Sequence, residues 1–193
     1  MSNLNFVFPE IFISVGFMFL LILGVYKKNS TNLIYNLSIV FLVILFVLVI
    51  NLFSLSEISL FNQSYSIDRL SIIMKVLTIG SGIFVLISST NYIKNLKIFK
   101  IEYPILILTS ILGMMVMISS NDLIVFYLGL ELQSLALYVL ASFNRDNVLS
   151  SESGVKYFIL SALSSGLLLY GCSLIYGFSG TTNFNLISQS IES

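Results

Sequence analysis

The chain has 193 residues, of which 57% are hydrophobic and only 9% are charged, and its formal net charge is zero. Soluble domains carry about 25% charged residues, so this composition indicates an integral membrane protein. A net charge of zero gives no indication of a nucleic-acid partner or of attraction to an anionic membrane surface. The sequence has no histidine, and its single cysteine, Cys172, cannot form an internal disulfide or hold a cluster. We therefore expect any redox cofactor to be bound by other chains.

Apolar segments recur along the whole sequence and predict an all-α fold, a polytopic transmembrane helix bundle with about six transmembrane helices. A helix needs about 20 apolar residues to cross a hydrocarbon core about 30 Å thick. In chain order the predicted helices cover residues 11–26, 33–53, 70–90, 105–118, 122–143 and 151–176, followed by a polar C-terminal tail over 178–193. We interpret residues 1–193 as a single transmembrane domain, and we expect no cleavable signal peptide because the N-terminus lacks a basic region.

Two charged residues, Glu10 and Lys75, lie beside or within the predicted helices of the first half of the chain. Pro9 and Glu10 suit the first turn of the first helix, where proline lacks only an unneeded donor and a carboxylate favours the helix dipole. Lys75 lies inside the third predicted helix, near its start. We expect its long side chain to extend to the membrane interface, as lysines near helix ends usually do.

The fifth predicted helix carries one carboxylate, Glu131, close to its middle. Counted from Asp122 at about 1.5 Å per residue, Glu131 lies about 13 Å along the helix, near the bilayer midplane. A buried acid at this depth costs on the order of 2–3 kcal/mol or more. Ser134, Leu135 and Tyr138 follow at spacings that put them on the same face. We therefore expect this face to meet protein or water rather than lipid.

Lys156 lies inside the sixth predicted helix, which begins near Ser151. Glu131 and Lys156 are thus two intramembrane ions on adjacent helices. A carboxylate and an amine that can change protonation state are the groups that a proton-transfer path needs. A static ion pair that fixes helix packing is the alternative, and both direct contact and a bridging water remain open.

Lysine and arginine are distributed unevenly between the two sides of the predicted bundle. The connections after the first, third and fifth helices contain Lys27, Lys28, Lys94, Lys97, Lys100 and Arg145. On the opposite side only Arg69 lies at the membrane edge. The positive-inside rule places the more basic side inside, and an even number of spans then places both termini outside.

Around these two ions the sequence resembles a known family. The stretch LGLELQSLALYVLASFNR, followed by SSESGVKYFILSALSSGLLLYGCSLIYGFSGTTNF, closely resembles NADH dehydrogenase (ubiquinone) subunit 2 of mitochondrial respiratory complex I, whose bacterial counterpart is subunit N. The N-terminal VFPEIFI is similar to plant and protist forms. The resemblance is strong over residues 102–184 and rests mainly on hydropathy before that.

The resemblance implies an antiporter-like core subunit of the membrane arm of proton-pumping NADH:ubiquinone oxidoreductase. It would contribute to proton translocation coupled to electron transfer from NADH to ubiquinone, in the mitochondrial inner membrane with both termini facing the intermembrane space. Glu131 would be the essential glutamate of the first half-channel, and Lys156 the lysine that neighbours it. Lys75 departs from the family, since the resemblance implies an uncharged residue there.

The resemblance also implies cofactors and partners. Flavin, iron–sulfur clusters and quinone would be bound by other subunits, with none in this chain. The partners would be other membrane-arm subunits and membrane lipids, with no nucleic acid. In the family a broken helix and a further helix, each with a lysine, complete the half-channel before a second, inverted repeat. The sequence ends at Ser193, ahead of those elements, and we expect a split gene with a separate chain rather than a truncated product.

Two other functions stay open at this point. The chain could serve a cation/proton antiporter outside complex I, or it could be a structural membrane-arm subunit that no longer pumps. Co-purification with flavin and iron–sulfur subunits separates the first alternative from the preferred function. The retained intramembrane charges argue against the second.

Overall fold

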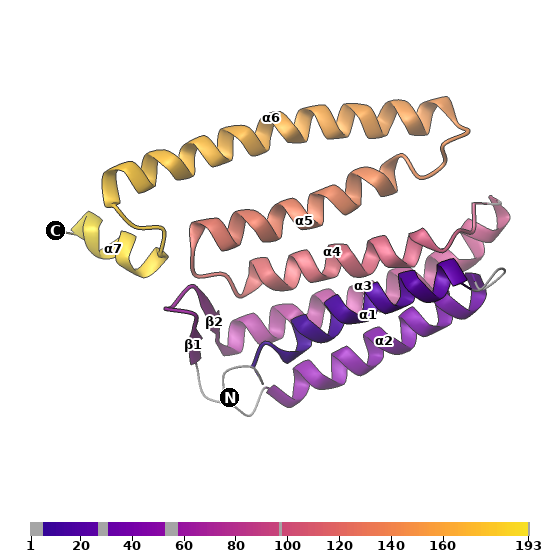
Figure 1. Cartoon of the computed structure of the whole chain (residues 1–193), viewed down its shortest axis with the longest axis horizontal. Coiled ribbons are helices and arrows are strands. Elements are labelled where there is room, and N and C mark those ends of the chain that lie inside the picture. The colour runs from indigo at the N-terminus through magenta and orange to yellow at the C-terminus, as the bar shows by residue number, and fades with distance from the viewer. Residues whose placement is uncertain (1–5, 27–30, 53–57, 97, 193) are drawn as a thin grey trace.

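A computed structural model describes residues 6–26, 31–52, 58–96 and 98–192, and most of them are helical (Figure 1). The helices are α1 (Phe8–Tyr26), α2 (Thr31–Asn51), α3 (Arg69–Asn95), α4 (Glu102–Ile118), α5 (Leu123–Ala141), α6 (Val148–Ser179) and α7 (Phe184–Glu192). Among the described residues, five helices are long and apolar enough to cross a membrane, and α4, with 17 residues, is a shorter apolar helix. The predicted all-α, polytopic fold is confirmed, and the chain is a multi-pass membrane protein.

Several helix ends differ from the predicted ones because capping residues, rather than hydropathy, decide where a helix begins. The side chain of Asn147 accepts a hydrogen bond from the backbone N–H of Leu149, so α6 begins at Val148 and not near Ser151. It continues to Ser179 and ends at Gly180, which adopts the left-handed φ of 68°. The tail that was predicted to be polar contains the 9-residue helix α7, which is too short to span a membrane.

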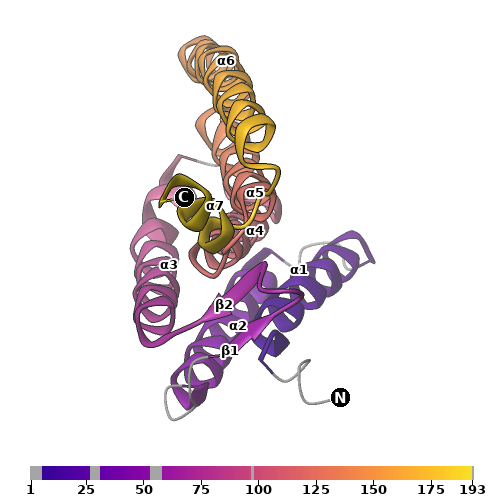
Figure 2. The same ribbon diagram turned by 90° about the vertical axis from the view of Figure 1, so that its left-hand side faces the viewer.

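Helices α1 to α4 form the packed part of the molecule, seen end-on in Figure 2. Its core contains fully buried aliphatic side chains from all four of these helices, including Ile13, Leu42, Ile79 and Leu108. Within a bilayer the lipid tails are as apolar as these residues, so close packing rather than escape from water holds the helices together. This bundle is the support against which α5 is placed.

Two glycines bring the backbones of α4 and α5 into contact. A Cβ atom at Gly113 would lie 2.6 Å from the backbone nitrogen of Gln133, and one at Gly129 would lie 2.8 Å from that of Met117. Only glycine permits such an approach. Because Gly129 lies two residues before Glu131, this contact fixes the height and rotation of α5 where it carries its carboxylate.

Helix α6 lies on the outer side of α5, away from α1–α4, in both views (Figures 1 and 2). Among the described residues of α6, only Gly154 is buried. Near that residue the helices approach closely, since a Cβ at Gly154 would lie 2.4 Å from the Cβ of Ser142. Farther along, the hydroxyls of Tyr127 and Ser165 lie 3.0 Å apart. Most of the surface of α6 is therefore left uncovered by the described chain.

A small hairpin lies in the polar stretch before α3, where no strand was predicted. Strands β1 (Ile58–Leu60) and β2 (Tyr65–Ile67) pair antiparallel, and their turn has three successive non-glycine residues with positive φ, Phe61, Asn62 and Gln63. The turn is held by its neighbours, because the side-chain amides of Asn121 and Asn183 both donate to the carbonyl of Gln63, at 2.8 and 3.0 Å.

The hairpin also joins the turn that leads into α5. The N–H of Ser66 donates to the carbonyl of Ser119 at 2.8 Å, and the N–H of Asn121 donates to that of Ser64 at 2.9 Å. The hairpin, this turn and α7 consequently meet at one end of the bundle, on the left in Figure 1.

Candidate proton-transfer site

Glu131 is half-buried on α5, beside the glycine contact with α4. Its Oε1 atom is buried and has no hydrogen-bond partner among the described residues. Leaving a buried acceptor unpaired costs about 1–3 kcal/mol, and more when the group is charged. This carboxyl group is therefore suited to take up a proton, a water molecule or a donor from another segment.

Lys156 does not form an ion pair with Glu131. Its Nζ atom lies 2.5 Å from Oε1 of Glu152, one turn earlier on α6, and the two side chains are 69% and 50% exposed. The sequence left open either direct contact between Glu131 and Lys156 or a bridging water. The direct contact is not formed. Counted from the ends of α5 and α6 that meet at their connection, Glu131 lies about 15 Å and Lys156 about 12 Å along the helices. The two ions share a depth without touching.

The face of small residues that follows Lys156 is mostly open. Gly166 has no atom within 4 Å of where its Cβ would be. Ser164 is exposed, whereas the hydroxyl of Ser165 contacts that of Tyr127 on α5. A face of small residues allows another helix to approach closely, so α6 has room there for one.

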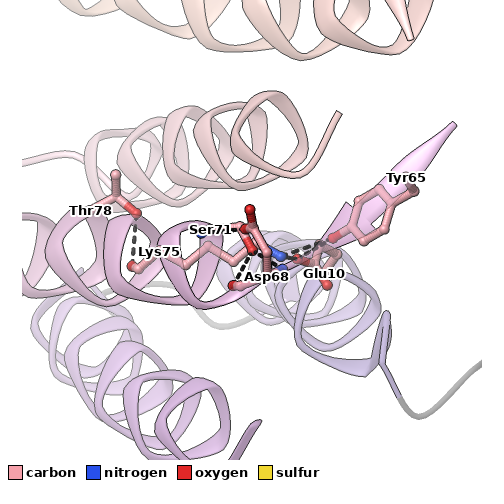
Figure 3. A network of polar contacts seen from close by, with 6 residues as sticks. All are labelled: Glu10, Tyr65, Asp68, Ser71, Lys75 and Thr78. Atoms are coloured by element: carbon pink, nitrogen blue, oxygen red, sulfur yellow. Dashed lines mark hydrogen bonds and ion pairs between the residues drawn. The ribbon is translucent and has the colours of Figure 1, made fainter. Parts of the chain in front are cut away.

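A second group of buried charges lies where α1, α3 and the hairpin meet (Figure 3). The Nζ atom of Lys75 donates to Oε1 of Glu10 at 2.7 Å and to the hydroxyl of Tyr65 at 3.0 Å. The Tyr65 hydroxyl donates to the same Glu10 oxygen at 2.7 Å. The side chains of Lys75 and Glu10 are only 2% and 6% exposed. These three residues form what we call the hairpin-end cluster.

The expectation that Lys75 extends to the membrane interface is wrong. Asp68 and Ser71 form a capping box that begins α3, and Lys75, a little over a turn later, faces inward toward α1. Glu10, expected only to favour the start of its own helix, compensates the buried ammonium. The sequence contains only part of the signal: α1 and α3 start at the same end of the bundle and carry these opposite charges within two turns of their starts, but their facing sides are not evident from it.

The phenol of Tyr65 completes the cluster as a donor. Burial, and then the negative charge of Glu10, raise the pKa of the Tyr65 phenol far above its ordinary value. The phenol therefore keeps its proton over the physiological pH range. Oε2 of Glu10, by contrast, is buried without a partner among the described residues, as is Oε1 of Glu131.

Comparison with known proteins adds the family context. The family model described as NADH:quinone oxidoreductase/Mrp antiporter matches residues 120–193. NADH-quinone oxidoreductase subunit N of Pelagibacter ubique is 68% identical over 193 residues, covering 100% of this chain and 41% of that protein. Subunit N of Bartonella bacilliformis is 46% identical over 191 residues, covering 99% of this chain and 39% of that protein. The chain thus spans about two fifths of the length of these relatives.

Two solved structures share the fold. One chain of respiratory complex I from Thermus thermophilus superposes with a TM-score of 0.78 at 22% identity, covering 91% of this chain and 38% of that one. One chain of the archaeal membrane-bound sulfane sulfur reductase superposes with a TM-score of 0.79 at 17% identity, covering 96% and 39%. At identities this low, the superpositions show a shared fold and nothing more. The assignment therefore rests on the relatives of high identity, and over nearly its whole length this chain is similar to part of NADH-quinone oxidoreductase subunit N.

Proposed function

We propose that this chain forms part of a proton-translocating membrane subunit of NADH-quinone oxidoreductase. The observation that carries the proposal is the 68% identity, over the whole chain, to a protein named as subunit N of that enzyme. The chain matches only about two fifths of such relatives, so the activity belongs to the assembled subunit and complex. The other membrane-arm subunits and lipid are its partners, and flavin, iron–sulfur clusters and quinone are bound elsewhere in the complex.

Within this function Glu131 is the carboxyl group that takes up and releases a proton. Its support is the buried, unpartnered Oε1 atom on a helix whose height is fixed by a backbone contact. Lys156, at a similar depth, is the neighbouring base. Glu131 and Lys156 do not touch, and Lys156 forms an ion pair with Glu152. Proton transfer between Glu131 and Lys156 therefore requires a bridging water or a change of partner by Lys156.

The exposed ions on α6 indicate what must cover them. A charged pair left against lipid at this depth is costly, and the open small-residue face beside it admits a helix. We expect the remaining part of the subunit to cover both. A separate polypeptide that supplies a lysine-bearing helix remains our prediction for that part.

The location follows from the same reasoning. The protein resides in an energy-coupling membrane with both termini on its positive side, which in a mitochondrion is the intermembrane space. The mitochondrial inner membrane stays a prediction from the resemblance alone, because the relatives named above are bacterial. A bacterial cytoplasmic membrane suits those relatives better.

The test of the proposed function is the Glu131→Gln variant in the native host, with a purification tag on this chain. The wild-type chain should co-purify with flavin and iron–sulfur subunits. The purified sample should reduce quinone with electrons from NADH. The variant keeps shape and hydrogen-bonding capacity but cannot titrate, so the complex should assemble and pump fewer protons per electron. The measurement is acidification of proteoliposomes during NADH oxidation.

The outcomes of this test separate the competing functions. Co-purification without flavin or iron–sulfur subunits would favour a cation/proton antiporter outside complex I, a function included in the description of the matching family model. Normal pumping by the Glu131→Gln variant would make Glu131 a packing residue and would favour a structural subunit.

A further inference from the structure

We propose that the hairpin-end cluster of Glu10, Lys75 and Tyr65 is a second protonation site, which binds a water molecule and one exchangeable proton at Oε2 of Glu10. This inference rests on the proposed function for its use in pumping. The site lies on α1, α3 and the hairpin, and so belongs to the packed bundle rather than to the α5–α6 pair that carries Glu131.

Hydrogen-bond geometry singles out Oε2 of Glu10. Oε1 accepts two hydrogen bonds, from Lys75 and Tyr65, at 2.7 Å each. Oε2 is buried and accepts none from the described residues. A buried carboxylate oxygen without a donor is unstable unless a water donates to it or a proton binds it. The cluster therefore has one open position, and it lies on its acidic member.

The other members hold the site in place without competing for the exchangeable proton. The Tyr65 phenol stays protonated, because burial and the Glu10 charge disfavour the phenolate. The Lys75 ammonium is bound by both neighbours. Asp68, drawn beside the cluster in Figure 3, has its own partner, because its carboxylate accepts from the N–H of Ser71. Glu10 is left as the member of the cluster with an open acceptor position.

The loading step balances as a simple proton transfer. One O–H bond breaks in a hydronium ion, which leaves as water, and one O–H bond forms at Oε2 of Glu10. The cluster changes from a neutral ion pair to a single positive charge on Lys75, and no electron moves. Release reverses the step when a water molecule accepts the proton.

The cluster is also linked to the helix that carries Glu131. Tyr65 forms a β-bridge with Ser120, in the turn that leads into α5, and the N–H of Ser66 donates to Ser119 at 2.8 Å. A change of charge at Glu10 therefore acts on a strand that is hydrogen-bonded to the start of α5. This connection gives the second site a physical route to the first.

The experiment uses the native complex with the double variant Glu10→Gln/Lys75→Met, which removes both charges together and leaves no unpaired ion. The matched control is Glu102→Gln/Lys100→Met, the same replacements at exposed positions. We expect both complexes to assemble and oxidise NADH, while only the cluster variant loses protons pumped per electron. Equal pumping by the assembled cluster variant and control would show a purely structural ion pair and overturn the proposal.

A further variant and a structural readout cover failure to assemble. Glu10→Gln alone keeps Lys75 and the side-chain shape, and the same loss of pumping is expected. If neither variant assembles, density at Oε2 of Glu10 in the wild-type complex decides. A resolved water there supports the site, whereas a protein donor or tight apolar packing overturns it. If Glu131→Gln lowers pumping and the assembled cluster variants do not, only this inference fails. Normal pumping by Glu131→Gln would instead count against the proposed function.

Discussion

Lys75 and Lys156 are lysines within apolar helices, but they occupy opposite environments. Lys75 is 1% exposed and bonded to a carboxylate and a phenol from two other elements. Lys156 is paired only with Glu152 of its own helix, on an exposed face. Solvent-exposed ion pairs on one helix typically stabilise a protein by about 0.3–0.5 kcal/mol. Removing one partner of a buried pair costs about 3–5 kcal/mol, because the other charge is left uncompensated.

This difference predicts how the two lysines respond to the same replacement. Lys75→Met should destabilise the protein by about 3–5 kcal/mol, since Glu10 then remains buried without its counter-ion. Lys156→Met should change stability by less than about 1 kcal/mol. The measurement is the temperature at which the tagged chain aggregates from detergent-solubilised membranes. Restoration of stability by adding Glu10→Gln to Lys75→Met would confirm that the unpaired charge is the cause, and equal effects of the two single variants would contradict the argument.

At the scale of elements, the contact between α4 and α5 depends on the absence of two side chains. A Cβ at Gly113 would lie within 3.0 Å of three backbone atoms of α5, whose positions cannot adjust as a flexible side chain does. Helix packing in a membrane depends on such close approaches, because burying apolar surface contributes little to helix association there. The position of Glu131 relative to the bundle therefore rests on Gly113 and Gly129.

We predict that Gly113→Ala, and separately Gly129→Ala, will force α5 away from α4 and lower both the amount of assembled complex and its pumping. Overpacking of a close contact typically costs about 1–3 kcal/mol. Gly166→Ala is the matched control, because nothing lies within 4 Å of its Cβ position. Native gels measure the amount of assembled complex, and acidification of proteoliposomes during NADH oxidation measures pumping. Normal assembly of both test variants would mean that the two helices tolerate a wider separation.

The spans were predictable because hydropathy acts over lengths near 20 residues, and each predicted span overlaps one helix from α1 to α6. Helix ends were less predictable, because single caps such as Asn147 decide them. The hairpin was missed because its strands have three residues each, too few to show alternation. Glu131 was predicted as an intramembrane acid from its position alone. Glu10 was not predicted as the partner of Lys75, since a sequence does not reveal which faces of α1 and α3 meet.

At the scale of the whole molecule, the basic residues of the connections lie mainly at one end of the bundle. The hairpin, the turn before α5 and α7 lie at one end (Figure 1). At the other, basic end Lys94 lies in the last turn of α3, and Lys100 and Arg145 lie in the described parts of the connections. The positive-inside rule applies to such short connections and places the basic end inside.

This arrangement predicts opposite accessibility for two exposed positions, Asn62 in the hairpin and Asp146 between α5 and α6. With Cys172→Ser removing the native thiol, Asn62→Cys should react with a membrane-impermeant maleimide from the outer side. Asp146→Cys should react only in inverted vesicles. Labelling is read on the tagged chain, so that cysteines of other subunits do not interfere. Reaction of both positions from one side would contradict an odd number of spans between them. Reversed reactivity would place the basic connections outside, and both termini would then lie inside, against the predicted topology.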